Sequence, residues 1–263
     1  MSFARWAALA AFALAGTAAD AAIVRVSAAN FNAQAGLITF SEFGLNTVNP
    51  VYAPAQYGGG ATAPTVSFGG WFLGQSLSPT PSADCPGAAA SACVVGAPTG
   101  PLSLDPNAPN TFITTDGSNP TSPVLSGSPR FNGPIAVLFD VDQVAVGFDG
   151  GFFDAVGSTG ITAFARDGSL IGTVTNEITG IEFLGLVSDN AQAVIAGVFL
   201  DLVGTEPAGF AIDNLRFGVR GQIILPPGVT DPGQVSQVPV PAALPLLISG
   251  LAALQFVRRR RTV

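Results

Sequence analysis

The sequence predicts an all-β protein, an antiparallel β-sandwich of the jelly-roll type, with a cleavable N-terminal signal peptide and a single C-terminal transmembrane helix. Apolar residues alternate with a period of two along most of residues 135–218. Gly, Pro, Asn and Asp separate these runs at short intervals, as turns do between strands. No long stretch between the two terminal segments carries a helical apolar stripe, so the alternative architecture is a closed β-barrel and not a helical fold.

The first 22 residues form the predicted signal peptide. Arg5 gives a cationic start, an apolar run extends from Trp6 to Gly16, and the small residues of "TAADAA" supply the cleavage spacing. The apolar run is shorter than the roughly 20 residues that cross a bilayer as a helix. We therefore expect export, with cleavage after Ala21 or Ala22; a buried N-terminal helix is the alternative.

The β domain is expected over residues 23–218. Its early strands are predicted in "IVRVSA" and "LITFSEF". Residues 44–134 hold 14 of the 21 Pro, so this part should consist mostly of turns and loops, interrupted by short strands such as "PTVSFGGWFLG" and "NTFITT". The charged residues of that region are four: Asp84, Asp105, Asp116 and Arg130.

Residues 135–218 form the part of the domain that is richest in predicted strands. The expected strands are "IAVLFD", "QVAVGFDGGFF", "ITAFAR", "SLIGTVT", "IEFLGLV", "AVIAGVFLDLV" and "GFAIDNLRFG". Asp167-Gly168 alone separates two of these runs, which predicts a β-hairpin with a two-residue turn. The expected total is ten or eleven strands, around a core supplied by many of the 19 Phe residues.

The two cysteines, Cys85 and Cys93, lie close together in "CPGAAASAC". In an exported protein, an even and closely spaced pair within a flexible loop is most simply a disulfide. Two free thiols are the alternative. A metal site would need further ligands, and the chain contains no His.

The C-terminal part begins with a Pro, Gly and polar stretch over residues 219–237, which is typical of a linker. Residues 238–257 then read "VPVPAALPLLISGLAALQFV", with no charge. A helix of that length reaches about 30 Å, enough to cross a bilayer; because of the prolines we expect it over about 242–257. Arg258, Arg259, Arg260 and Arg261 follow, which places the β domain outside the cytoplasm by the positive-inside rule.

This tripartite ending resembles the PEP-CTERM family of bacterial sorting signals. Its short motif, Val238, Pro239, Val240, Pro241 and Ala242, is similar to the VPLPA variant, with Val240 where that pattern has Leu. The resemblance covers about 26 residues. It implies a Gram-negative bacterium that makes exopolysaccharide, recognition by an exosortase, which is a membrane cysteine transpeptidase, and cleavage near the motif on the way to the cell surface or extracellular matrix.

The body, from "ITFSEF" to "GFAIDNLRFG", also resembles uncharacterised β-rich domains that precede such signals. That resemblance implies no chemistry for the domain.

The charge distribution excludes several function classes for the domain. Between the two terminal segments there are sixteen acidic residues and five Arg, a net charge of −11. Nucleic acid is therefore not an expected partner, whereas divalent cations are plausible ones. The chain contains neither Lys nor His, which excludes imidazole base catalysis, Schiff-base chemistry and His-ligated metal centres.

Two groups of acidic residues stand out, and the first is a candidate site for Ca²⁺. Glu42 in an early strand and Asp213 in the last strand resemble the pair that shares a structural Ca²⁺ in jelly-roll carbohydrate-binding modules. The second group is Asp140, Asp142, Asp149 and Asp154, which we interpret as a solvated strand edge whose charges discourage edge-to-edge pairing.

Sugar binding and hydrolysis are the two remaining chemical hypotheses. Tyr52, Tyr57 and Trp71 fall within 20 residues of each other and are candidates for a platform that stacks against sugar rings, although core packing is the alternative for each. A glycoside hydrolase needs only two carboxylates, but no spacing selects a pair among the four Glu residues. The sequence therefore predicts an exported, non-catalytic surface or matrix protein, with a carbohydrate-binding module for exopolysaccharide as the alternative and a glycosidase as the third hypothesis.

Overall fold

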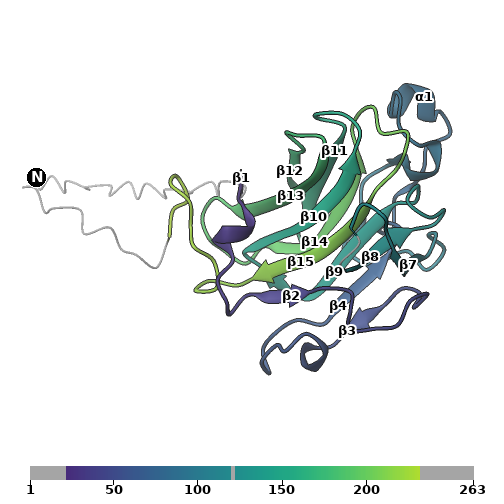
Figure 1. Ribbon diagram of the computed structural model, residues 1–263. Coiled ribbons are helices and arrows are strands. Elements are labelled where there is room, and N and C mark those ends of the chain that lie inside the picture. The colour runs from purple at the N-terminus through teal and green to yellow at the C-terminus, as the bar shows by residue number, and fades with distance from the viewer. Residues whose placement is uncertain (1–21, 120–121, 232–263) are drawn as a thin grey trace, which may run out of the picture. The chain divides into compact units, whose positions relative to one another are not determined.

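The computed structural model describes residues 22–119 and 122–231 (Figure 1). The predicted sorting motif Val238–Ala242, the transmembrane helix and the Arg cluster lie outside these residues, as does the predicted signal peptide up to residue 21. Within the described part, no helix combines the length and the apolar character needed to span a bilayer.

The prediction of an all-β antiparallel fold is confirmed, since the described helices are single turns. The helix α1 spans Pro81–Asp84, and the 3-10 helices η1, η2 and η3 span Ala28–Asn30, Pro54–Gln56 and Ala90–Ala92. Fifteen strands are present in the described residues, more than the ten or eleven expected, because several strands in the loop-rich region are only two residues long.

The strands of the described residues form two large sheets and one small one, all with antiparallel pairing. The seven-stranded sheet has the order β1-β13-β10-β15-β8-β7, and β2 also pairs with β15. Its strands are β1 (Ile23–Arg25), β2 (Gly36–Ile38), β7 (Thr111–Thr115), β8 (Pro123–Gly127), β10 (Ala145–Phe153), β13 (Gly180–Ser188) and β15 (Ala211–Gly218).

The six-stranded sheet has the order β12-β11-β14-β9-β4-β3. Its strands are β3 (Val51–Tyr52), β4 (Val66–Gly69), β9 (Ile135–Gln143), β11 (Thr159–Phe164), β12 (Leu170–Thr175) and β14 (Ile195–Leu202). The small sheet pairs β5 (Ser76–Leu77) with β6 (Val94–Val95).

Side chains from both large sheets fill one core. Phe148 and Leu186 of the seven-stranded sheet belong to the same buried cluster as Val137 and Leu200 of the six-stranded sheet. Burying large apolar side chains in this way stabilises the fold by roughly 1.5–3 kcal/mol for each residue. The two sheets therefore pack face to face, which fits the predicted sandwich.

The period of two is visible in β9, whose alternate residues contribute to two different clusters. Val137 and Phe139 point into the core between the sheets, whereas Ala136 and Leu138 lie on the opposite face of the sheet. The loop-rich segment around Trp71 covers that outer face. The cluster formed there contains Trp71, Phe72, Leu102, Ala136, Phe164, Ala196 and Phe199.

The hairpin between β11 and β12 is present, but its turn is longer than predicted. The Ala165 carbonyl oxygen accepts a 3.0 Å hydrogen bond from the Gly168 N–H, and the Ala165 N–H donates to the Ser169 carbonyl at 2.9 Å. The loop thus has three residues, Arg166, Asp167 and Gly168, and of these only Gly168 has a positive φ (+86°). This is the pattern of a hairpin that closes with a glycine bulge, so the two-residue turn is wrong.

The predicted disulfide is confirmed, because Cys85 and Cys93 are joined at an S–S distance of 2.02 Å. The loop that it closes packs against the connection between β14 and β15. The Ala89 N–H donates to the Glu206 carbonyl oxygen at 2.9 Å, and the Glu206 N–H donates to the Gly87 carbonyl oxygen at 3.3 Å. The cross-linked loop is therefore held to the sandwich by backbone hydrogen bonds.

The domain extends beyond the predicted boundary at residue 218. Ile223 is buried and forms a β-bridge with Phe31, and the compact unit ends at Val229. The Pro and Gly content of this stretch suggested a linker, but the apolar residues between the turns pack on the domain.

Candidate functional site

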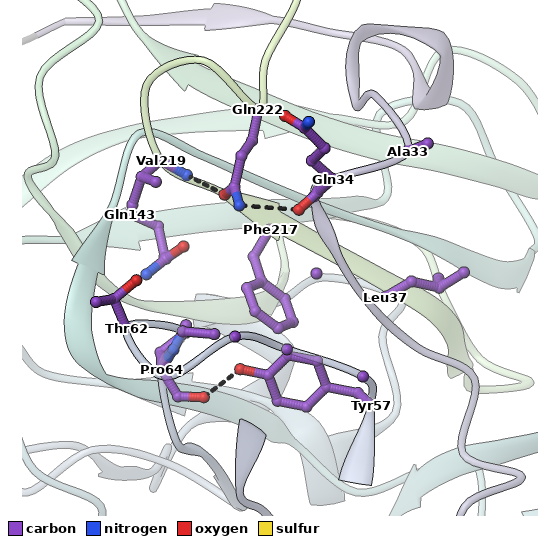
Figure 2. A pocket seen from close by; sticks show the side chains of 16 residues that line it. Ala33, Gln34, Leu37, Tyr57, Thr62, Pro64, Gln143, Phe217, Val219 and Gln222 are labelled. Carbon is purple, nitrogen blue, oxygen red and sulfur yellow. Dashed lines mark hydrogen bonds between the residues drawn. The ribbon is translucent and has the colours of Figure 1, made fainter. Parts of the chain in front are cut away.

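A cavity of about 370 Å³ lies where the N-terminal segment, the loop after β3 and the end of β15 meet (Figure 2). It is lined by residues 33–37, 57–60 and 62–64 and by Gln143, Phe217, Val219 and Gln222. Its volume falls within the range of roughly 300–1,000 Å³ that is common for small-molecule sites.

The wall near the C-terminal end of the domain is held by Gln222. Its Oε1 accepts the N–H of Val219 at 2.9 Å, and its Nε2 donates to the carbonyl oxygen of Gln34 at 2.8 Å (Figure 2). The turn that follows β15 is thereby fixed against the N-terminal segment, so this wall is organised before any ligand binds.

Two aromatic rings form the opposite side. The rings of Tyr57 and Phe217 meet edge to face at a centroid distance of 5.3 Å. The Tyr57 hydroxyl donates to the carbonyl oxygen of Pro64, which fixes the ring (Figure 2). Gly36 permits the position of Phe217, because a Cβ there would lie 2.3 Å from the Phe217 ring. Burial and, to a smaller extent, the nearby Asp140 charge raise the pKa of Tyr57 to about 12, so the phenol is neutral at physiological pH.

Gln143, the last residue of β9, contributes a buried amide. Gln143 is 1% exposed, and its Nε2 donates to the carbonyl oxygen of Val141 at 2.7 Å. No hydrogen bond from the described residues reaches its Oε1. This atom is not among the fully buried ones that lack a partner, so it is open to the cavity, and an amide oxygen held there can accept a hydrogen bond from a ligand.

The predicted aromatic platform is only partly present. Tyr57 lines the cavity, but Tyr52 is 0% exposed and packs among Phe40, Phe43 and Phe68. Trp71 is 8% exposed, and its indole N–H donates to Asp105 at 3.3 Å. The two buried rings, Tyr52 and Trp71, present no face to a ligand. They belong to the packed interior, and the prediction that they form part of a sugar-stacking platform is wrong.

Glu42 and Asp213, the expected calcium pair, occupy different environments. Glu42 Oε1 accepts the N–H and the hydroxyl of Thr39, each at 2.9 Å, while its Oε2 is buried with no partner in the described residues. Asp213 is buried, and both of its oxygens accept hydrogen bonds from Asn119 and Asn214. Burial raises the pKa of Asp213 above its usual value, and these hydrogen bonds offset part of that rise.

A shared cation is therefore not required to satisfy Asp213. Within residues 22–119 and 122–231, no group of three or more Asp, Glu or Cys side chains is arranged to hold a metal ion.

The predicted acidic strand edge is wrong, because β9, which carries Asp140 and Asp142, and β10, which carries Asp149, each lie between two other strands. The group contains one ion pair that the sequence did not indicate. Asp142 Oδ1 accepts a 3.0 Å hydrogen bond from Arg166 Nε, and it also pairs with Arg166 Nη2. Asp140 accepts the N–H of Thr65 at 2.7 Å. The two carboxylates, two residues apart, thus have different partners, which relieves their mutual repulsion.

Three of the four Glu residues weighed for hydrolysis have partners within the fold. Glu177 and Glu182 both pair with Arg25, at 3.2 and 3.1 Å. Glu206 is buried, and its Oε2 accepts the Asp154 N–H at 3.0 Å and the Ser158 hydroxyl at 2.9 Å. These contacts give each carboxylate a structural role.

Comparison with known proteins adds nothing to this description, since no family model, no curated protein and no solved structure matches the chain. The cavity itself was only partly foreseen. Of its residues, the sequence singled out Tyr57; Gln143, a polar residue inside a run of apolar β-formers, was a signal that could have been used.

Proposed function

We propose that this protein is an exported, non-catalytic component of the cell surface or extracellular matrix. The observation that carries the proposal is the disulfide between Cys85 and Cys93, because such bonds persist in oxidising compartments and are rare in the cytosol. The cationic and apolar start of the sequence supports the same route.

The C-terminal sequence supports a specific mode of sorting. A Pro-containing motif, an apolar run and four Arg are the features of a signal that halts the protein in the inner membrane beside an exosortase. Cleavage near Pro241 then releases the domain to the surface. The partners in this proposal are the secretion machinery, the exosortase and, transiently, the inner membrane of a Gram-negative bacterium.

The strand order supports a jelly-roll topology for the sandwich. The strands β8 to β15 alternate between the two sheets, apart from the β11–β12 hairpin, and lie in the orders β8-β15-β10-β13 and β9-β14-β11-β12. This is the arrangement of an eight-stranded jelly roll, a fold that also serves lectins.

Carbohydrate binding is the second candidate function. One specific observation favours it: the cavity in Figure 2 combines aromatic rings with amide side chains.

Mass spectrometry of the protein recovered from the cell surface or medium tests the sorting proposal. We expect mature protein that lacks everything after about Pro241 or Ala242. Changing Pro239 and Pro241 together to Ala should leave the full-length form in the membrane fraction, because the substitution extends the helix and removes the exposed motif.

The matched control is a double change of Pro226 and Pro227 to Ala, which removes two adjacent prolines before the proposed motif. This variant should be processed normally. Intact C-terminal peptides in surface-released material, or normal release of the Pro239 and Pro241 variant, would contradict the proposal.

A further inference from the structure

The cavity in Figure 2 is uncharged, although the domain around it is strongly acidic. Among the described residues that line it, none carries a carboxylate or a guanidinium group, and its one ionisable side chain, Tyr57, stays protonated. A charged ligand would lose its hydration there and find no opposite charge in return. The lining therefore selects for a neutral ligand.

The amides of the cavity retain hydrogen-bonding capacity. A Gln side chain offers two donors and two acceptor lone pairs. Gln143 uses one donor, for Val141, and Gln222 uses one donor and one acceptor, for Gln34 and Val219. Both donors and acceptors thus remain, held on side chains that the protein has already oriented. This combination suits hydroxyl groups, which donate and accept at once.

Tyr57 supplies the complementary apolar surface, because its ring is only half-buried. Phe217 is 1% exposed and packs against that ring, and the bond from Tyr57 to Pro64 also holds it in place. A ligand with an apolar face on one side and hydroxyl groups around its rim matches both walls. An apolar molecule would leave the amides unsatisfied, which costs free energy.

We propose that this cavity binds a segment of an uncharged saccharide, with the sugar lying against Tyr57 and its hydroxyl groups bonded to Gln143 and Gln222. The inference rests on the carbohydrate-binding candidate and is independent of the sorting signal.

Direct binding tests the inference. The purified full-length protein is applied to an array of neutral gluco-, galacto- and manno-oligosaccharides, with uronic-acid oligosaccharides of equal length as the charged comparison. We expect binding to a neutral class and not to the uronic acids. The affinity should not change with salt concentration, since no ion pair contributes.

Variants locate the site. Gln143→Leu should weaken binding about tenfold, since a sugar hydroxyl loses its partner. Thr62→Phe adds a bulky ring at an exposed position of the cavity rim and should block binding without touching the core. The matched controls are Gln192→Leu, an exposed amide outside the lining residues, and Phe152→Ala, a 53% exposed ring outside them; both should bind as the wild type does.

Three results would overturn the inference: no neutral saccharide binds at millimolar concentration, only uronic acids bind, or Thr62→Phe binds as well as the wild type. The melting temperature of each variant separates loss of fold from loss of contact. If Gln143→Leu does not fold, the binding measured for Thr62→Phe decides whether the cavity is the saccharide site. C-terminal processing, measured on the same proteins, should be unaffected, so failure of the sorting proposal and failure of this one are distinguishable.

Discussion

Replacing Glu206 with Gln should stabilise the protein at alkaline pH. Glu206 is 0% exposed, and burial raises its pKa from the usual value of 4.5 to about 7. The hydrogen bonds from Asp154 and Ser158 lower the pKa, while the neighbouring Asp154 carboxylate raises it. Both hydrogen bonds reach Oε2, and Oε1 is buried with no hydrogen-bond partner in the described residues.

The sign and size of the effect follow from this pKa. Because the folded state holds the proton more tightly than the unfolded chain, the stabilisation from Glu206 is complete below about pH 4.5 and is lost as the pH rises through about 7. A pKa difference of about 2.5 corresponds to about 3 kcal/mol in the free energy of unfolding. Gln is isosteric with the protonated acid and cannot ionise, so the variant should avoid this loss.

Urea unfolding at about pH 5 and about pH 9 measures the difference. Between these values, the free energy of unfolding of the wild type should fall by about 3 kcal/mol more than that of Glu206→Gln. Asp201, whose pKa burial raises to about 6, contributes equally to both proteins and cancels in the comparison.

The control for loss of one carboxylate is Glu177→Gln, at an exposed residue that is ion-paired with Arg25. Parallel pH profiles for the wild type and Glu206→Gln would refute the reasoning.

Two further predictions concern the disulfide and the proposed cation. The exported protein should show no free thiol until it is reduced; labelling of Cys85 and Cys93 without reductant contradicts this, and loss of the bridge should cost at most roughly 2–3 kcal/mol, because the closed loop is short. If Glu42 and Asp213 share Ca²⁺, a chelator should lower the melting temperature, and Asp213→Ala should lower it equally while abolishing the chelator's effect. Identical melting curves with and without chelator would leave both as carboxylates that bind no cation.

The strands were predictable where one physical rule dominates. In β9 and at the start of β10 both faces of the strand are buried, in different clusters, and the sequence records this as the unbroken apolar runs 135–139 and 144–146. The turn after β11 was harder, because Asp167-Gly168 is compatible with both a two-residue and a three-residue loop. Arg166 belongs to the loop and reaches Asp142, a contact that no local pattern contains.

The cavity could be predicted only in part, because its walls are distant in the sequence. Gln143 ends β9 of one sheet and Phe217 lies in β15 of the other; the bond from the Val144 N–H to the Gly218 carbonyl oxygen brings these strand ends together. Tyr57 reaches them from the loop after β3. The aromatic composition drew attention to Tyr52, Tyr57 and Trp71 as a group, but burial separates them. Exposure depends on long-range packing, which residue types within a short window do not reveal.

The position of β15 has a mechanical consequence. It is a central strand, bonded to β10 on one side and to β8 and β2 on the other, and the chain that leaves it is joined to residues 30–32 by four hydrogen bonds. Tension on the chain beyond Val229 therefore acts first on these four hydrogen bonds. It then acts on β15, which is bonded to strands on both sides and cannot detach as an edge strand would. Because Val219 and Gln222 lie between that end of the chain and β15, pulling on the chain beyond Val229 also strains a wall of the cavity.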